Sequence, residues 1–352
     1  MNRHSYSLDA FRVLAIFGVF FCHLNFYNGG LEEGLTLLDS VLANIGGLAA
    51  HFFIVLSAFL AAYFYDRGMS KGYWSYVKKR MRRLLPVNIV TLPFYVVITT
   101  YVGFYALSFG KTIVDVLLST FLLQELLKFS AQLFNTPAWT ISTLFILYLI
   151  TPALMWPIRK LKNPWVLVAL VVVLTWSDVE YREWLTAVKP DNWWLNYASP
   201  VNRILSFVLG LALGHAARVI ICPQQLRRYT TYIELAVFGI FFYGCAMIQK
   251  DYAVCHYVVT YSTPLIIALC FMEGGVITRL ISACGISKAS PYVYAFYMCH
   301  FFFILLAYAV CNQMLGIWGH LTLAQGYAMA VATFLVACGA SVLLHHFVEK
   351  RF

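Results

Sequence analysis

Long uninterrupted apolar blocks are the feature that most constrains this sequence. Of its 352 residues, 61% are hydrophobic and only 11% are charged, which is less than half the share of about 25% in soluble globular domains. Several blocks of 18 or more residues carry at most one charge, and a helix of that length can cross a hydrocarbon core of roughly 30 Å. This composition excludes a soluble enzyme, a disordered chain and a disulfide scaffold. We therefore expect an all-α, polytopic membrane protein.

The apolar blocks predict ten spans, with both ends of the chain in the cytoplasm. This arrangement puts 19 of the 25 lysines and arginines on the cytoplasmic side, as the positive-inside rule requires. The net charge of +10 is thus explained by the lipid bilayer, and we expect no nucleic-acid partner. The stretch 112–128 is amphipathic and is predicted to lie in the interface. The expected spans are 10–28, 41–65, 85–108, 139–158, 164–178, 201–220, 230–249, 253–272, 290–312 and 322–347.

The segment 178–200 is predicted to be an external loop after the fifth span. One interpretation is an aromatic belt at the outer interface. The other is a saccharide-binding platform, because indole faces pack against sugar C–H groups and carboxylates accept hydrogen bonds from hydroxyls. The residues that suggest these two interpretations are Asp178, Glu180, Tyr181, Glu183, Trp184, Asp191, Trp193, Trp194 and Tyr197.

The first span carries ionisable residues at membrane depth. Arg12 and His23 are eleven positions apart, close to three helical turns, so they share one face about 16 Å apart along the helix. Asp9 lies one turn before Arg12 and can pair with it. Ionisable residues within a membrane are costly and usually mark a functional interior surface. The alternative is that His23 only hydrogen-bonds a neighbouring helix.

A basic cluster precedes the third span. Lys79, Arg80 and Arg83 belong to a run of cations that ends at Pro86. Such a cluster can bind anionic lipid headgroups. It can also form a phosphate-binding mouth, because guanidinium groups one turn apart grip phosphates bidentately. The phosphates of a coenzyme A thioester would suit that mouth.

The end of the chain contains His345, His346 and Glu349. We interpret them as solvated residues at a helix end and expect no metal site. The cysteines mostly lie in apolar runs, where they are expected to pack as small hydrophobic side chains.

Four motifs together resemble the acyltransferase 3 family of bacterial ten-span membrane acyltransferases. Together with a fifth match at the end of the chain, they occur in order from residue 8 to residue 350, so one membrane domain is expected over 1–352. A fifth, terminal match is His346-x-x-Glu349-Lys350. The four are Leu8-Asp9-x-x-Arg12 followed by His23, the run Phe52 to Leu60, Lys79-Arg80-x-x-Arg83-Leu84-x-Pro86, and Tyr294-x-x-Tyr297-x-x-His300.

The resemblance implies transfer of an acyl group, usually acetyl, from cytoplasmic acyl-CoA to a hydroxyl of a cell-envelope glycan or lipid-linked saccharide. It implies a location in the bacterial inner membrane, with acyl-CoA as cosubstrate and no bound cofactor. The implied catalytic residues are His23 and Arg12, with Asp9 holding Arg12. The implied donor-binding residues are Arg80, Arg83 and Lys79. Residues proposed for acceptor binding or a proton path are Trp139, Ser142, Tyr297, His300 and Glu349.

The sequence also departs from the family pattern. Ala58 stands where a Gly is frequent, and Thr143 stands where a Glu is frequent, which leaves the acceptor open. No SGNH hydrolase domain is expected after the last span, so the transfer would be completed in the membrane. The competing hypothesis is a transporter or channel in which Arg12, His23 and His300 form a proton relay.

Overall fold

Apolar helices separated by short polar connections make up the computed structural model of this protein. It describes residues 5–31, 37–127, 134–220, 229–247 and 252–351. These residues form helices and turns, with no strand beyond an isolated bridge between Leu31 and Leu321. The chain forms two compact units. The family resemblance led us to expect a single domain, and that expectation stays a prediction.

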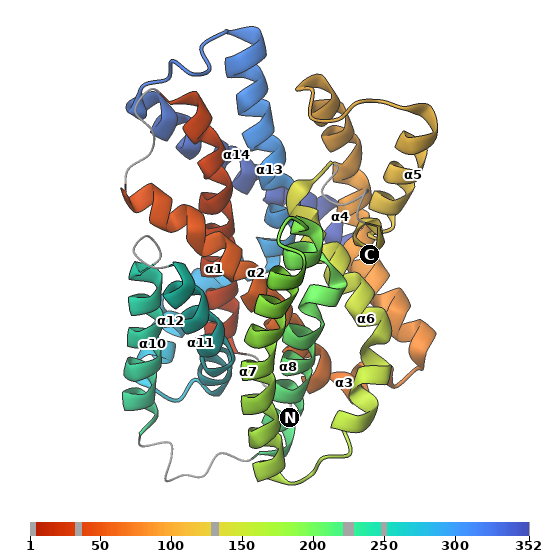
Figure 1. Ribbon diagram of the computed structural model, residues 1–352, viewed down its shortest axis with the longest axis vertical. Helices are drawn as coiled ribbons and strands as arrows, with labels where there is room; N and C mark the ends of the chain where they lie inside the picture. Colours follow the sequence, from red (N-terminus) through yellow and green to blue (C-terminus); the bar gives the residue numbers. More distant parts are fainter. Residues whose placement is uncertain (1–4, 32–36, 128–133, 221–228, 248–251, 352) are drawn as a thin grey trace. The chain divides into compact units, whose positions relative to one another are not determined.

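The first unit comprises residues 1–15, 47–77 and 146–290. Within it α7 packs along α8 and α10 packs along α11 (Figure 1). Its helices are most of α2 (Leu37–Tyr63), α3 (Tyr65–Met69), most of α6 (Trp139–Ile158), α7 (Pro164–Val188), α8 (Pro200–Val219), α10 (Thr230–Ala246), α11 (Tyr252–Met272) and α12 (Val276–Ala283), with a π-helical turn at Trp194–Ala198.

The second unit comprises residues 16–46, 78–145 and 291–352. Within it α13 packs along α14. Its helices are the second half of α1 (Tyr6–Leu24), whose first half belongs to the first unit, most of α4 (Tyr73–Tyr101), α5 (Phe109–Thr120), α13 (Val293–Ala309) and α14 (Leu323–Phe347). Short 3-10 turns of this unit lie at Asn25–Gly30, Gln124–Leu126, Thr136–Ala138 and Glu349–Arg351, and a π-helical turn lies at Val310–Met314; the 3-10 turn Ile286–Tyr292 lies mostly in the first unit.

Eight helical segments of the described chain are long and apolar enough to cross a membrane. Two shorter apolar helices, Leu48–Tyr63 and Thr230–Ala246, coincide with the second and seventh expected spans. The all-α, polytopic membrane class is therefore confirmed. The first part of the amphipathic stretch expected at 112–128 belongs to α5. This helix is not one of the segments that are long and apolar enough to cross a membrane.

The fifth span was placed too short. Helix α7 continues to Val188, so the connection expected from residue 178 begins only at Lys189. Asp178 and Arg182 are one turn apart on α7, and both are buried inside the first unit. Buried charged side chains need partners, and the helical spacing lets these two residues pair with each other. Their charges therefore do not indicate a loop.

Helix α4 begins at Tyr73, twelve residues before the third expected span. Lys, Arg and Met are good helix formers, so the basic run is itself helical. The basic residues belong to the N-terminal part of α4, which precedes its apolar part. The donor-binding candidates therefore have the fixed spacing of a helix.

Polar caps fix the helix ends of the first unit. The carboxylate of Glu234 accepts hydrogen bonds from the backbone N–H groups of Gly275, Ile277 and Thr278 at the start of α12. The carboxylate of Glu273 accepts from the backbone N–H of Ser7 at 2.8 Å, at the start of α1. These carboxylates satisfy N–H groups that lack a partner at a helix N-terminus.

Small residues bring α2 and α8 into close contact. A Cβ at Gly210 would lie 2.3 Å from the carbonyl oxygen of Val55, and one at Gly214 would lie 2.2 Å from that of Phe59. Glycine is therefore required at both positions for this approach, which is a common way to pack helices in membranes.

Candidate functional site

Two histidines at membrane depth meet in the second unit. Nδ1 of His23 on α1 lies 3.2 Å from Nε2 of His300 on α13. His300 is completely buried, whereas His23 is partly accessible. A hydrogen bond from His23 to a neighbouring helix, the alternative interpretation of this residue, is thus present, and its partner is a second histidine at membrane depth.

The backbone around His300 fixes its tautomer. Nδ1 of His300 lies 2.8 Å from the carbonyl oxygen of Tyr297. A carbonyl can only accept, so Nδ1 carries the proton and Nε2 of neutral His300 is an acceptor. His23, which also hydrogen-bonds the backbone of Val19, then faces His300 with its Nδ1 proton, so the basic lone pair of neutral His23 is on Nε2. That lone pair is the feature a general base needs.

Aromatic rings pack around the histidine pair. The ring of Phe296 stacks on His300 with centroids 5.7 Å apart, and Phe301 lies 5.3 Å from the ring of His23. The hydroxyl of Tyr297 donates to the carbonyl of Pro137, just before Trp139, which is itself buried. Tyr297 and Trp139 therefore belong to the packing that holds α13 in place.

Arg12 and Asp9 meet in the first unit. Their Nη1 and Oδ1 atoms are 3.3 Å apart, and both side chains are about one-fifth exposed. The hydroxyl of Ser290 donates to the same Asp9 oxygen at 2.9 Å. Ser290 was not identified as a site residue from the sequence. It directly precedes Pro291 in the turn before α13. The pairing predicted for Asp9 and Arg12 is present.

The basic residues lie near the start of α4. Lys79 and Arg83 are exposed, and Arg80 is partly buried. Arg80 and Arg83 are one turn apart, as expected. The hydroxyl of Tyr294 donates to the carbonyl of Leu84, which ties this end of α4 to the start of α13. His300 follows Tyr294 on α13 by six residues, or about 9 Å along the helix.

The start of α6 holds Ser142 in a structural role. Its hydroxyl donates to the carbonyl of Leu122 at 2.8 Å and accepts from the backbone N–H of Glu125 at 3.2 Å. Thr143, where the family often has Glu, is completely buried. Glu125 is also completely buried, so the connection after α5 brings a carboxylate to this end of α6 that sequence reasoning did not identify.

Glu349 pairs with His345 at the end of the chain. Nδ1 of His345 lies 2.9 Å from Oε2 of Glu349, and the His345 ring packs edge-on against Tyr292. The motif singled out from the sequence used His346, which instead lies near Lys350. This pair joins α14 to the segment before α13.

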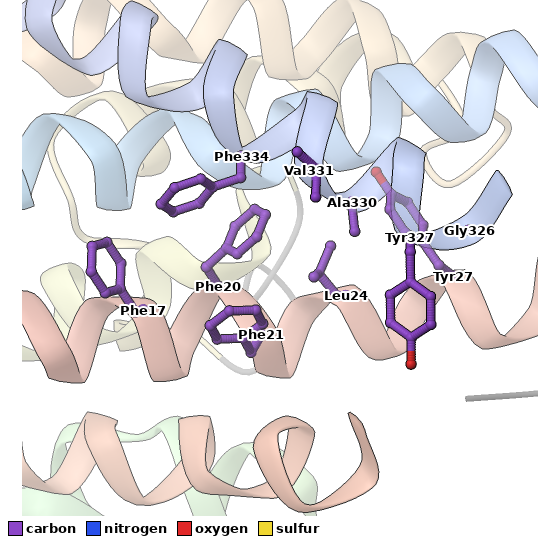
Figure 2. Close-up of a pocket in the computed structure, with 10 residues that line it drawn as sticks. All are labelled: Phe17, Phe20, Phe21, Leu24, Tyr27, Gly326, Tyr327, Ala330, Val331 and Phe334. Atoms are coloured by element: carbon purple, nitrogen blue, oxygen red, sulfur yellow. The ribbon is translucent and has the colours of Figure 1, made fainter. Parts of the chain in front are cut away.

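An apolar groove runs beside the histidine pair. It lies between α1 and α14 and has a volume of about 240 Å³ (Figure 2). Phe20 forms part of its wall, and the Phe20 ring is 6.3 Å from that of His300. A hydrocarbon chain could occupy this groove. Its lining is Phe17, Phe20, Phe21, Leu24, Tyr27, Gly326, Tyr327, Ala330, Val331 and Phe334.

Comparisons with known proteins agree with the residue pattern. The model of a family described as "Acyltransferase domain" (Acyl_transf_3) matches residues 5–345. The chain is 25% identical to "Acyltransferase MdmB" of Streptomyces mycarofaciens over 359 residues, covering 98% of this chain and 90% of that protein. No solved structure matches the chain. With a family match over nearly its whole length, this multi-pass membrane protein belongs to the acyltransferase 3 family and is a membrane acyltransferase.

Proposed function

We propose that the protein moves an acyl group, usually acetyl in the family, from cytoplasmic acyl-CoA to a hydroxyl of a cell-envelope glycan or lipid-linked saccharide in the bacterial inner membrane. The observation that carries the proposal is the histidine pair of the second unit. Its hydrogen bonds leave Nε2 of His23 able to take a proton. A sugar hydroxyl is a poor nucleophile at neutral pH, so it needs such a base.

The proposed reaction is a direct acyl transfer. Nε2 of His23 removes the proton of the acceptor hydroxyl while its oxygen attacks the thioester carbonyl. The new C–O bond forms, the C–S bond breaks, and the proton passes from His23 to the leaving thiolate, giving the ester and free coenzyme A. The reaction neither releases nor consumes a net proton, and acyl-CoA is the cosubstrate.

Arg80 and Arg83 are proposed to anchor the donor. Two guanidinium groups one turn apart can hold phosphate oxygens bidentately, and the exposure of Arg83 and Lys79 leaves them open to a soluble ligand. The link between α4 and α13 through Tyr294 supports this assignment, because it connects the basic mouth with the helix that carries His300.

Arg12 is proposed to orient the acyl-CoA donor, because it lies about 16 Å along α1 from His23, too far to contact the thioester oxygen that reacts there. Its guanidinium is held by Asp9, which Ser290 positions in turn. A fixed cation needs little reorganisation during the reaction. The competing hypothesis assigns Arg12 to the proton relay of a transporter. The test therefore measures acyl transfer itself.

The test uses membranes that contain the wild-type protein or the Arg80→Ala/Arg83→Ala variant. They are incubated with radiolabelled acetyl-CoA and total cell-envelope glycans, with no ion gradient. The control is Lys78→Ala/Arg82→Ala, which removes two positive charges from the same run. We expect label in the glycan fraction with the wild type and the control, and at least about a tenfold higher KM for acetyl-CoA with the Arg80/Arg83 variant.

Two results would contradict this proposal. If the wild type neither transfers label nor binds acetyl-CoA, acetyl-CoA is not the donor of this acyltransferase. If both double variants lose the same affinity, the basic run attracts anions through net charge alone, and Arg80 and Arg83 form no specific phosphate site.

A further inference from the structure

A second group of ionisable residues is buried in the first unit, and none of them is assigned above to catalysis or donor binding. Four helices contribute to it. Asp178 is completely buried, His51 and Arg203 are each 2% exposed, and Arg182 is 7% exposed. Ionisable residues inside a membrane protein are costly and usually functional. We define the inner polar cluster as His51 of α2, Asp178 and Arg182 of α7, Arg203 and Ser206 of α8, and His256 of α11.

The carboxylate of Asp178 lies at the centre of this cluster. Its Oδ1 accepts a hydrogen bond from Ser206 at 2.7 Å. Its Oδ2 lies 3.7 Å from Nδ1 of His51 and 3.5 Å from Nη2 of Arg182. These two distances exceed a direct hydrogen bond, so neither His51 nor Arg182 gives Oδ2 of Asp178 a hydrogen bond.

Several polar atoms of the cluster have no hydrogen bond to any residue that the structure describes. They are both ring nitrogens of His51 and Oδ2 of Asp178. One nitrogen of neutral His51 donates and the other accepts, whereas Asp178 Oδ2 accepts only. Leaving such groups unsatisfied costs about 1–3 kcal/mol each. A ligand hydroxyl satisfies both kinds of group, because it can accept from Arg182 or His51 and donate to Asp178.

The packing of α2 against α8 makes this arrangement rigid. Gly210 lies against Val55, and Gly214 lies against Phe59. One turn earlier on both helices, the same register brings His51 to the level of Ser206. The cluster is therefore built into the helix interface and does not depend on a loop.

Aromatic side chains connect the cluster with the surface of this unit. The guanidinium of Arg203 lies 4.9 Å from the Tyr197 ring, and that ring is 5.4 Å from the ring of Trp193. Trp193 is 43% exposed. Aromatic faces beside hydroxyl-binding groups are typical of saccharide recognition, which was one of the two interpretations of segment 178–200.

We propose that the inner polar cluster binds hydroxyl groups of the saccharide acceptor, with Trp193 and Tyr197 packing against the sugar. This inference rests on the proposed function, because it assigns where the acceptor of that reaction is held. Acyl-CoA binding is assigned to other residues, so loss of the cluster should affect only one substrate.

The test compares His51→Gln with His215→Gln. Both histidines are buried in the first unit, but His215 hydrogen-bonds the carbonyl of Leu161 and lies outside the cluster. Purified proteins are assayed with radiolabelled acetyl-CoA against a dilution series of one cell-envelope glycan preparation. Hydrolysis of acetyl-CoA without glycan and thermal unfolding in detergent are measured in parallel. Trp193→Leu is a second variant, because its exposed side chain can be replaced without disturbing the fold.

We expect His51→Gln and Trp193→Leu to raise the half-saturating amount of glycan about tenfold, which corresponds to the loss of about one hydrogen bond or stacking contact. Acetyl-CoA hydrolysis should be unchanged, and His215→Gln should match the wild type. The inference is overturned if glycan saturation is unchanged in both variants, or if glycan use and acetyl-CoA hydrolysis fall together in variants that stay folded. If His51→Gln unfolds, Trp193→Leu decides between these outcomes. A wild type without hydrolysis or transfer would instead contradict the proposed function.

Discussion

In the proposed mechanism, His300 acts through its hydrogen bond to His23. Its Nε2 accepts the Nδ1 proton of His23, and this bond strengthens when His23 becomes charged. Hydrogen bonds to charged groups contribute about 1.5–3 kcal/mol, so His300→Ala should lower kcat about 10–100-fold. KM for acetyl-CoA should stay close to that of the wild type.

The conservative variant separates positioning from packing. In His300→Gln the amide oxygen can still accept the proton of His23, so part of the activity should return, and the pH profile of kcat should be displaced relative to the wild type. Equal loss of kcat in the Ala and Gln variants, with an unchanged pH profile, would show that His300 acts only by filling space.

Glu273 provides a prediction on pH and stability. Burial alone would raise the pKa of this carboxyl, but hydrogen bonds from Ser7, Ser5 and Ser282 outweigh it and hold the pKa below its ordinary value. The folded state therefore binds a proton less readily than the unfolded state. Its contribution to stability is complete above the unfolded pKa and is lost as the pH falls through the folded pKa.

The measurement for Glu273 is thermal unfolding in detergent across acidic pH. Glu273→Gln should lower Tm at neutral pH and show a smaller further loss on acidification than the wild type. Parallel acid profiles for the two proteins would contradict this role of Glu273.

At the scale of elements, the contact between α2 and α8 depends on glycine. Gly210→Ala would place a methyl group against the carbonyl oxygen of Val55 and the Cβ of Ala58. Overpacking of this kind typically costs about 1–3 kcal/mol. We expect Gly210→Ala to lower Tm in detergent.

Gly239 on α10 is the matched control, since a Cβ there meets nothing within 4 Å. Gly239→Ala should leave Tm unchanged or raise it, because alanine has the higher helix propensity. If the two variants have the same Tm, the contact between α2 and α8 does not require glycine at position 210.

The boundaries of individual helices could be predicted where charge and hydropathy agree. The expected span at 139–158 coincides with α6, because Trp139 and the cations after Ile158 delimit an apolar run. Asp178 and Arg182 misled the prediction for α7, because a sequence does not show that two charges one turn apart are paired and buried. For α4, the expected span began only at residue 85, although the basic residues before it favour a helix.

At the scale of the whole molecule, hydropathy and charge alone give the membrane class, whereas the site needs tertiary structure. The sequence identifies His23 and Arg12 through their spacing on one helix. It cannot show that His23 meets His300, 277 positions away, or that Ser290 holds Asp9. The inner polar cluster is the clearest omission, because His51 lies in an apolar run with no local pattern to mark it.

The central claim is that Nε2 of His23 accepts the proton of the acceptor hydroxyl. The most direct test compares the wild type with His23→Gln, both purified in detergent, for transfer of label from acetyl-CoA to cell-envelope glycans and for binding of acetyl-CoA. General bases typically contribute about 10²–10⁴-fold, so transfer should fall by at least about 100-fold while acetyl-CoA binding is unchanged. A His23→Gln protein that transfers label at the rate of the wild type would contradict the account.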